Sequence, residues 1–507
     1  MIRKKRPEKR YSMCSFPVDK VLIEKYANDF SIPRELATIV ARRYPEYSEA
    51  QRYLFPSVEQ LHDPASMPDI KVAVDKIIET VKHGDGILIY THDDVDGYTS
   101  AAVVYKALND ITRNSDGIYV YPIVRERDGY VLNPQVLRTY RDKGVRLLLT
   151  VDFGISNKDN FHIAEKEALN AVICDHHETT LDNFPNPAVN PKRPDSEYPF
   201  RELAGVGVAF KLAQSLYQEF FGMSAKEFYS LKKNFFPIVC IGTFSDRVAL
   251  REENRVFCVH GMQLMQETEE AWAVFLRQSG EVDINRLHRE VLSTLGSAAY
   301  VDPRLGIEFF IHEEMDRVVE CYNTLRETDQ RRRQEIDSLF SEVVSSAEAT
   351  SELVLSVIPL SKQHYLGSVA ARLREYFKRN SIIIGVKDNK CIGELRSCDL
   401  DLYRLLYDMR DFFLDFGGHK KAAGFSMDRR NLEPFLDGLQ SYLRNHSVDI
   451  QNACDLSDSE PEALLRKSDI GMLGRLVPFG EGNPAPILTD GVSKYTIDNM
   501  LNIIEKV

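Results

Sequence analysis

Four short, largely apolar runs, separated by amphipathic or polar stretches, most constrain the fold of this 507-residue chain. The runs are Ile87–Tyr90, Ile118–Tyr121, Leu147–Val151 and Ala171–Cys174. Such runs are typical of strands buried on both faces of a sheet, and their alternation with helical stretches indicates βαβ units. We therefore predict an α/β fold with a doubly wound parallel sheet, in which ligands bind outside the carboxyl ends of the strands.

The rest of the chain predicts further domains, because 507 residues exceed what one hydrophobic core usually holds. Residues 304–349 are polar and helical, with no Pro or Gly after Gly306, and predict a long connecting helix. A second, smaller α/β unit begins at Leu353–Val357. The predicted organisation is an N-terminal helical segment (1–71), the α/β domain (72–303), the connecting helix (304–349), the second α/β domain (350–446) and a tail (447–507).

Composition bears mainly on the compartment. No apolar stretch is long enough to span a bilayer, and no signal-peptide core follows the basic N-terminus, so we expect a cytoplasmic protein. The eight cysteines form no C-x-x-C pair, which argues against a zinc site or a disulfide framework and for a reducing compartment. The net charge of −12 neither indicates nor excludes nucleic-acid binding, since basic residues can be confined to one groove.

Acidic and histidine side chains follow three of the predicted strands, and a further carboxylate comes later in the chain. The set is His92, Asp94, Asp96, Asp152, Asp175, His176, His177 and Asp246. Carboxylates and imidazoles are ligands of divalent metals, and the excess of carboxylates favours Mn²⁺ or Mg²⁺ over a single zinc ion. The set predicts a site for two metal ions that hydrolyses a phosphate ester. The alternative at each position is an acidic residue that only caps a helix.

The spacing within these segments fits a metal site. Alternate residues of an extended segment point the same way, so His92, Asp94 and Asp96 can face one point. Gly97 lets the backbone turn into the following helix without a side chain in the way. His176 and His177 are adjacent and cannot both reach one metal from a strand, so we expect one to ligate and the other to face the substrate or the second ion.

The chain resembles the DHH phosphoesterases, named after the triplet seen here as Asp175-His176-His177, and within them the single-stranded-DNA-specific exonucleases. The resemblance covers roughly residues 30 to 490 and rests on an ordered set of segments, since the triplet alone is weak evidence. Those segments are 61–64 (LHDP), 190–192 (NPK), 198–200 (YPF), 203–211 (LAGVGVAFK), 242–246 (GTFSD), 253–255 (ENR) and 417–424 (GGHKKAAG), the last similar to the signature of the DHH-associated domain.

The resemblance implies a 5′-to-3′ exonuclease that degrades single-stranded DNA to mononucleotides with two Mn²⁺ or Mg²⁺ ions, in DNA repair and recombination. It implies single-stranded DNA as partner, with a single-strand-binding protein and a helicase beside it. By motif position the metal ligands would be His92, Asp94, Asp96, Asp152, His176 and Asp246. Asp152 would bridge the two ions, His177 would be catalytic or phosphate-facing, and Asp175 would orient its neighbours.

Substrate-binding residues also follow from the resemblance. Arg125 and Arg396 would bind the 5′-terminal phosphate, for which a guanidinium offers bidentate contact, with Ser397 beside Arg396. Gly417, Gly418 and His419 would approach a phosphate or base. Arg372 would contact the DNA backbone. The alternatives are surface ion pairs for Arg125 and Arg396, a tight turn at Gly417–His419 and a solvated helix face for Arg372.

The chain departs from the family at three places. Glu394 stands where the family often has a small hydroxyl residue, and its charge would repel a terminal phosphate. The segment 295–300 (LGSAAY) also differs from the usual stretch. Bacterial members generally continue into an OB fold, whereas residues 447–507 can form at most a partial one. The rival functions are a phosphodiesterase of short oligonucleotides or cyclic dinucleotides, and a non-enzymatic scaffold, which the filled ligand positions oppose.

Overall fold

The fold was analysed in a computed structural model of the chain. It describes residues 19–113, 116–124, 128, 131–155, 158–179, 184–350, 353–360, 363–398, 400–418, 420–446, 461–464, 467–490 and 493–506. Two compact units result, one formed by Met1–Asp329 with Glu460–Val507 and one by Gln330–Ser459. No helix in the described residues has both the length and the apolar character that crossing a bilayer requires.

The first unit is built on a five-stranded parallel sheet with the order β2-β1-β3-β4-β5. Its strands are β1 (Gly86–Thr91), β2 (Ile118–Pro122), β3 (Val145–Val151), β4 (Asn170–Cys174) and β5 (Ala188–Val189). The four predicted apolar runs are thus strands, and the prediction of a doubly wound parallel sheet is confirmed. From β1 the chain goes to β2 on one side and then crosses back to β3 on the other side of β1, so the sheet has its switch point between β1 and β3.

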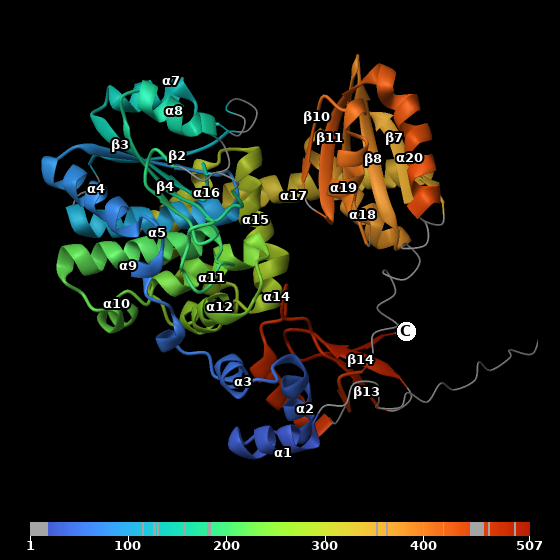
Figure 1. Ribbon diagram of the computed structural model, residues 1–507, viewed down its shortest axis with the longest axis horizontal. Helices are drawn as coiled ribbons and strands as arrows, with labels where there is room; N and C mark the ends of the chain where they lie inside the picture. Colours follow the sequence, from blue (N-terminus) through green and yellow to red (C-terminus); the bar gives the residue numbers. More distant parts are fainter. Residues whose placement is uncertain are drawn as a thin grey trace, which may run out of the picture. The chain divides into compact units, whose positions relative to one another are not determined.

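Helices cover both faces of this sheet (Figure 1). On one face lie α4 (Ile70–His83), α5 (Val95–Thr112) and α9 (Gly205–Phe221), and on the other α7 (Pro134–Arg141) and α8 (Lys158–Lys166). The first face carries the larger apolar core, because further helices pack against it. These are α10 (Ala225–Leu231), α11 (Phe235–Asp246), α12 (Glu252–Met265), α13 (Ala271–Gln278), α14 (Ile284–Arg286), α15 (Leu292–Gly296) and α16 (Arg304–Ile311).

The two ends of the chain share a core in the same unit. Helices α1 (Lys20–Asp29), α2 (Arg34–Arg43) and α3 (Tyr47–Leu54) pack on β12 (Ala463–Leu464), β13 (Ile487–Thr489), β14 (Lys494–Ile497) and β15 (Ile503–Lys506). Arg43 meets the carboxylate of Glu462 in a bidentate pair, with both N···O distances at 2.8 Å. The expectation of a separate helical segment and a separate tail is therefore corrected. No local pattern reveals a contact between residues more than 400 positions apart.

The second unit is a six-stranded mixed sheet with the order β10-β11-β9-β8-β7-β6. Its strands are β6 (Glu348–Ala349), β7 (Leu353–Pro359), β8 (Asn380–Lys387), β9 (Lys390–Arg396), β10 (Asp415–Gly418) and β11 (Ala422–Asp428). Helix α18 (Leu366–Phe377) packs on one apolar cluster, and α19 (Leu402–Asp408) and α20 (Leu432–His446) on another. This arrangement confirms the expected second α/β unit.

The predicted connecting helix over 304–349 is two helices. Helix α16 ends at Ile311 because His312 takes an extended backbone conformation, with φ −72° and ψ 135°. Helix α17 (Met315–Ser346) then begins and runs without interruption. The break lacks Pro and Gly, which is why the sequence pattern did not reveal it.

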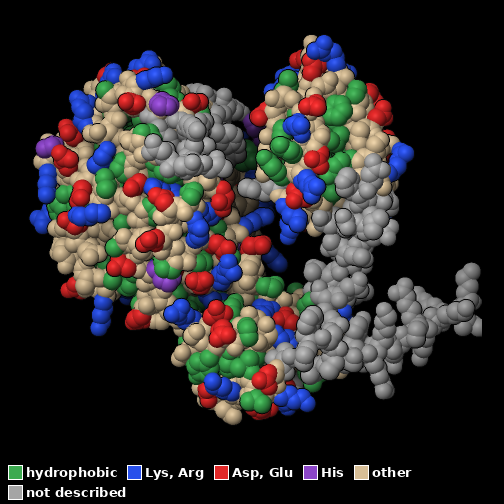
Figure 2. Space-filling model, in the orientation of Figure 1, with side chains coloured by type: hydrophobic (Ala, Val, Ile, Leu, Met, Phe, Trp, Pro, Cys, Tyr) green, Lys and Arg blue, Asp and Glu red, His purple; other side chains and the backbone are tan. Residues whose placement is uncertain are grey.

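Acidic and basic side chains are interspersed on the face shown in Figure 2, in keeping with the expectation that overall charge says little about partners.

Candidate metal centre

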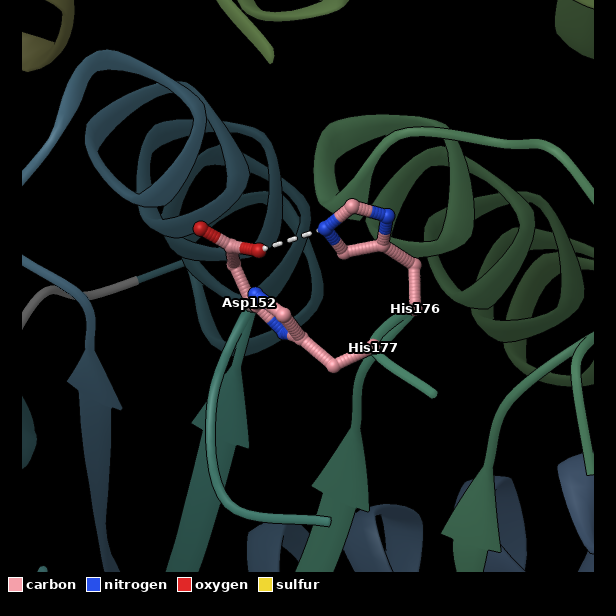
Figure 3. Close-up of side chains that lie close together, drawn as sticks. All are labelled: Asp152, His176 and His177. Atoms are coloured by element: carbon pink, nitrogen blue, oxygen red, sulfur yellow. Dashed lines mark ion pairs between the residues drawn. The ribbon is translucent and has the colours of Figure 1, made fainter. Parts of the chain in front are cut away.

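The carboxyl ends of β1, β3 and β4 bring the predicted metal ligands together beside the switch point. Asp152 follows β3, and His176 and His177 follow β4, so that the three side chains converge above the strand ends (Figure 3). The carboxylate of Asp152 lies 3.2 Å from Nε2 of His176. Asp246 joins them from the last position of α11, with Oδ2 3.7 Å from Nδ1 of His176.

Asp94 combines a structural role with a place in the centre. It is the N-cap of α5, and its Oδ1 accepts a hydrogen bond from the amide of Gly97 at 3.0 Å. Its Oδ2 lies 2.7 Å from Nδ1 of His92. Asp94 does cap a helix, but only Oδ1 serves the cap, and Oδ2 faces the centre beside His92. A Cβ on Gly97 would stand 2.5 Å from the carbonyl oxygen of His92, so glycine is needed for this turn.

Asp96 is held by the N-terminus of α9. Its two oxygens accept hydrogen bonds from the amides of Gly205 at 2.7 Å and Val206 at 2.9 Å. The first turn of a helix offers free amides and a positive dipole end, both of which stabilise a carboxylate. A Cβ on Gly205 would lie 2.6 Å from Oδ1 of Asp152, so this glycine allows the helix to approach the centre. Sequence reasoning assigned no role to this segment, although glycine at a helix start is a usable signal.

Asp175 orients both histidines through hydrogen bonds. Its Oδ1 accepts the amides of His176 at 2.7 Å and His177 at 3.1 Å and lies 2.7 Å from Nδ1 of His177. Its Oδ2 accepts the amide of Ile155 at 2.9 Å. Burial alone would raise the pKa of Asp175, but the charge and hydrogen bond of His177 hold it well below its ordinary value. In turn, against the effect of burial, Asp175 raises the pKa of His177 to about 9.

His176 has a nitrogen that fits a cation. Its Nδ1 lies 3.1 Å from the carbonyl oxygen of Leu203, which only accepts, so Nδ1 carries the hydrogen. Burial lowers the pKa of His176, so the ring is neutral and Nε2 presents a lone pair. That buried Nε2 has no hydrogen-bond partner and faces oxygens of Asp152 at 3.2 Å and Asp96 at 3.8 Å. A lone pair facing two ionised carboxylates is repulsive unless a proton or a cation lies between them, and a divalent cation can satisfy all three groups at once.

Three groups of side chains in the centre have ligand atoms within 4.8 Å of one another. They are His92-Asp94-Asp152, Asp152-His176-His177 and Asp96-His176-Asp246. Asp152 belongs to two of these groups, which fits a carboxylate shared between two ions. It has a left-handed backbone with φ 52°, a conformation that costs a non-glycine residue energy. The predominance of oxygen donors suits Mn²⁺ or Mg²⁺.

The carboxylates repel one another when no cation is bound. Burial and the neighbouring Asp246 raise the pKa of Asp96 to about 7. Burial and Asp94 raise the pKa of Asp246 to about 7, and burial with the surrounding carboxylates raises that of Asp152 well above its ordinary value. The centre therefore destabilises the metal-free fold, and a divalent cation relieves the repulsion.

We expect the free energy of unfolding of the metal-free chain to fall as the pH rises from about 4 to about 7. In that window the folded state keeps protons on Asp96 and Asp246, whereas the unfolded state has released them. The loss should be on the order of 2–4 kcal/mol. Thermal unfolding in chelator across this range measures it, and Asp96→Asn should flatten the curve. A metal-free stability that rises between pH 5 and 7 would contradict this account.

The predicted substrate-binding residues lie in the second unit or outside the described residues. Arg125 and His419 are not among the described residues. Arg396 lies on β9, where its Nη1 is 3.0 Å from Oε2 of Glu394. The carboxylate that departs from the family pattern therefore pairs with the guanidinium of Arg396 and offsets its charge. Gly417 and Gly418 are on β10, and a Cβ on Gly418 would stand 2.5 Å from the carbonyl oxygen of Ala422. The two glycines are therefore part of a strand paired closely with β11, and their role in ligand binding stays a prediction.

Two further residues of this set have structural partners in the second unit. Ser397 is 1% exposed, and its hydroxyl donates to Oδ1 of Asn380 at 2.9 Å, so it braces the end of β9. Arg372 pairs with Asp337, which ties α18 to α17. A surface arginine in the sequence does not reveal its carboxylate partner 35 residues away.

Comparison with known proteins identifies two domains. Residues 86–243 match the model of the DHH family N-terminal domain, and residues 353–445 match the DHHA1 domain. The single-stranded-DNA-specific exonuclease RecJ of Bacillus subtilis is 28% identical over 90% of the chain, and that of Haemophilus influenzae is 27% identical over 75%. The chain spans 58% of the length of the first of these relatives and 70% of the second.

Solved structures show the same fold. The crystal structure of Thermus thermophilus RecJ in complex with Mn²⁺ covers 99% of this chain with a TM-score of 0.77 at 19% identity, and 74% of that chain is matched. A second structure, of exonuclease RecJ bound to manganese, covers 74% of this chain with a TM-score of 0.62 and 20% identity, and 94% of it is matched.

Proposed function

We propose that this chain, which carries the N-terminal and DHHA1 domains of the DHH family as its motifs predicted, is a metal-dependent 5′-to-3′ exonuclease. Its substrate is single-stranded DNA, and its products are 5′-mononucleotides. The setting is DNA repair and recombination in the cytoplasm, beside a single-strand-binding protein and a helicase. The names of the relatives, single-stranded-DNA-specific exonucleases, support the substrate.

One observation carries the proposal. The lone pair of His176 Nε2 is buried without a partner and faces two carboxylates, and Asp152 belongs to two candidate ligand groups. The ligands of two Mn²⁺ or Mg²⁺ ions would be His92, Asp94, Asp96, Asp152, His176 and Asp246. Bound there, the ions would neutralise the phosphodiester and lower the pKa of the attacking water.

The chain's own groups prepare this chemistry. The N-terminus of α9 fixes Asp96, and the carbonyl of Leu203 fixes the tautomer of His176, so the ligands are oriented before a cation arrives. Asp175 holds His177 as an imidazolium, because it raises the pKa of that ring to about 9. Half-exposed at the mouth of the centre, His177 is the group we assign to the phosphate. Its N–H donates to a non-bridging oxygen and stabilises the charge that develops there.

A second candidate function is favoured by the pairing of Arg396 with Glu394. A guanidinium neutralised at 3.0 Å by a carboxylate is a weaker ligand for a 5′-phosphate, and a cyclic dinucleotide has no terminal phosphate. A phosphodiesterase for short oligonucleotides or cyclic dinucleotides would use the same centre.

Four substrates separate the two candidates in the presence of Mn²⁺. They are a long single strand labelled at its 5′ end, the same sequence as a blunt duplex, a dinucleotide and a cyclic dinucleotide, with Asp94→Ala/Asp152→Ala as the control for contaminating nuclease. Immediate release of labelled mononucleotide from the long strand alone supports the exonuclease. Cleavage confined to the dinucleotide or the cyclic substrate would replace it with the second candidate.

Replacing Glu394 with serine should improve the use of 5′-phosphorylated strands. Removal of the carboxylate frees the guanidinium of Arg396, and we expect KM for a 5′-phosphorylated strand to fall by about 3- to 10-fold, about 1 kcal/mol. The KM for a 5′-hydroxyl strand should not change. Glu375→Ser is the matched control, because that carboxylate is exposed on α18. An equal change in KM for both strands would show that Arg396 does not bind the 5′-phosphate.

A further inference from the structure

A second group of candidate metal ligands lies outside the centre described above. Glu308, His312 and Cys321 have ligand atoms within 4.8 Å of one another. They come from two consecutive helices, α16 and α17, and all three belong to the first unit. Among the candidate groups in the described residues, this one alone contains a sulfur atom. Its donor chemistry therefore differs from that of the oxygen-rich centre.

The local fold brings the three side chains together. Glu308 and His312 are four residues apart at the end of α16, with Oε2 3.9 Å from Nε2. Helix α17 returns alongside, as the contact between the rings of Phe309 and Tyr322 at 5.4 Å shows. This packing turns Cys321, which is 4% exposed, toward the end of α16. The ligand atoms are thus already within about 1–1.5 Å of the separations found around a bound ion.

The surrounding charges leave the group available to a cation. Glu308 interacts electrostatically with Arg304 and Arg317, and Arg317 also acts on Cys321. Each is already paired with another carboxylate, Arg304 with Asp302 at 2.6 Å and Arg317 with Glu320 at 2.8 Å. His312 also lines a surface cavity of about 680 Å³, so an ion can reach its ring from solvent.

We propose that Glu308, His312 and Cys321 form a zinc site that fastens α16 to α17. One thiolate, one imidazole and one carboxylate make a three-ligand set with an open fourth position for water, and the sulfur selects Zn²⁺ over Mn²⁺ and Mg²⁺. On binding, the zinc–sulfur bond forms, the S–H bond breaks and the proton passes to solvent. The absence of C-x-x-C pairs opposes only zinc sites that use two neighbouring cysteines, and this site needs a single cysteine.

The plainer interpretation is a buried cysteine that only packs in the core. Burial raises the pKa of the Cys321 thiol to about 11, which makes it unreactive in the metal-free chain. Packing alone does not explain why an imidazole and a carboxylate converge on the same sulfur. The two interpretations differ in one measurable property, the formation of a metal–thiolate bond.

Cobalt(II) titration of the metal-free full chain detects that bond, since Co²⁺ takes zinc sites and its thiolate complexes show a charge-transfer absorption band. We expect the band to grow to a plateau as Co²⁺ is added and to vanish on addition of Zn²⁺. It should be absent in Cys321→Ser and retained in Cys391→Ser, a buried free cysteine of the second unit. His312→Gln should weaken Co²⁺ binding at least about tenfold. This substitution alters a side chain that is 29% exposed and so lies outside the packed core.

The site is tested independently of the proposed nuclease. The band should persist in Asp94→Ala/Asp152→Ala, where the other centre has lost its ligands. The fluorescence of Trp272, the chain's single tryptophan, gives a second signal, because its ring lies 5.2 Å from that of Phe310 on α16. A band that is absent from the wild type or present in Cys321→Ser would overturn the proposal. Unchanged affinity in His312→Gln would overturn it too.

Discussion

Asp152→Asn is expected to lower kcat on single-stranded DNA by about 10³-fold or more and to raise the thermal stability of the metal-free chain. The carboxylate belongs to two candidate ligand groups, so its loss affects both proposed ions. Several kcal/mol of charge stabilisation in the transition state correspond to that factor. In the metal-free fold the same charge is buried among carboxylates that raise one another's pKa, so an amide there removes repulsion.

The opposite signs of the two effects make this prediction specific. Steady-state rates in Mn²⁺ give kcat, and thermal unfolding in chelator gives the change in stability. Asp142→Asn is the matched control, because that aspartate is exposed and should change neither quantity. A variant that loses activity together with metal-free stability would show that Asp152 acts mainly through the fold. Added Mn²⁺ should stabilise the wild type more than the variant.

The parts of the centre predicted from sequence are those with a local signal. The apolar runs identified β1 to β4, and the carboxyl ends of parallel strands meet at one edge, so ligands from three segments were expected to converge. The spacing argument for His92, Asp94 and Asp96 assumed an extended segment, whereas α5 begins at Val95 and places Asp96 in a different ligand group from His92 and Asp94. The assignment of each residue to a role stays a prediction.

The parts that could not be predicted depend on contacts between distant segments. The amides of Gly205 and Val206 bind Asp96 from more than 100 residues away, and backbone groups carry no sequence signature of their partner. The burial of Ser397 depends on Asn380 in a neighbouring strand. The core shared by the two chain ends likewise depends on tertiary packing, which periodicity does not report.

Some motif residues hold the fold together and do not belong to the metal centre. Lys211 and Glu253, both fully buried, form an ion pair at 2.6 Å. Glu253 also accepts the hydroxyl of Tyr198 at 2.6 Å and the amide of His62 at 2.9 Å, and Lys211 donates to the carbonyl of His62 at 2.7 Å. Four of the segments that carry the family resemblance thus meet at one buried network.

Lys211→Met should therefore destabilise the first unit by about 3–5 kcal/mol, because it leaves the carboxylate of Glu253 buried without its cation. Burial already lowers the pKa of Lys211, and Glu253 opposes that effect, so each charge depends on the other. Urea unfolding followed by the fluorescence of Trp272 reports on this unit. Lys226→Met, on an exposed position of α10, should change stability by less than about 0.5 kcal/mol.

The double variant Lys211→Met/Glu253→Gln isolates the ion pair from the packing. Glutamine keeps an oxygen to accept the bonds from Tyr198 and His62 but carries no charge, so the double variant should be more stable than Lys211→Met alone. If the losses in the free energy of unfolding from the two substitutions instead add, the pair stabilises the fold through packing and hydrogen bonding. An unpaired buried charge would then not be the cause of the loss in Lys211→Met. Because both residues lie away from the metal ligands, kcat of folded protein should stay near the wild-type value in either case.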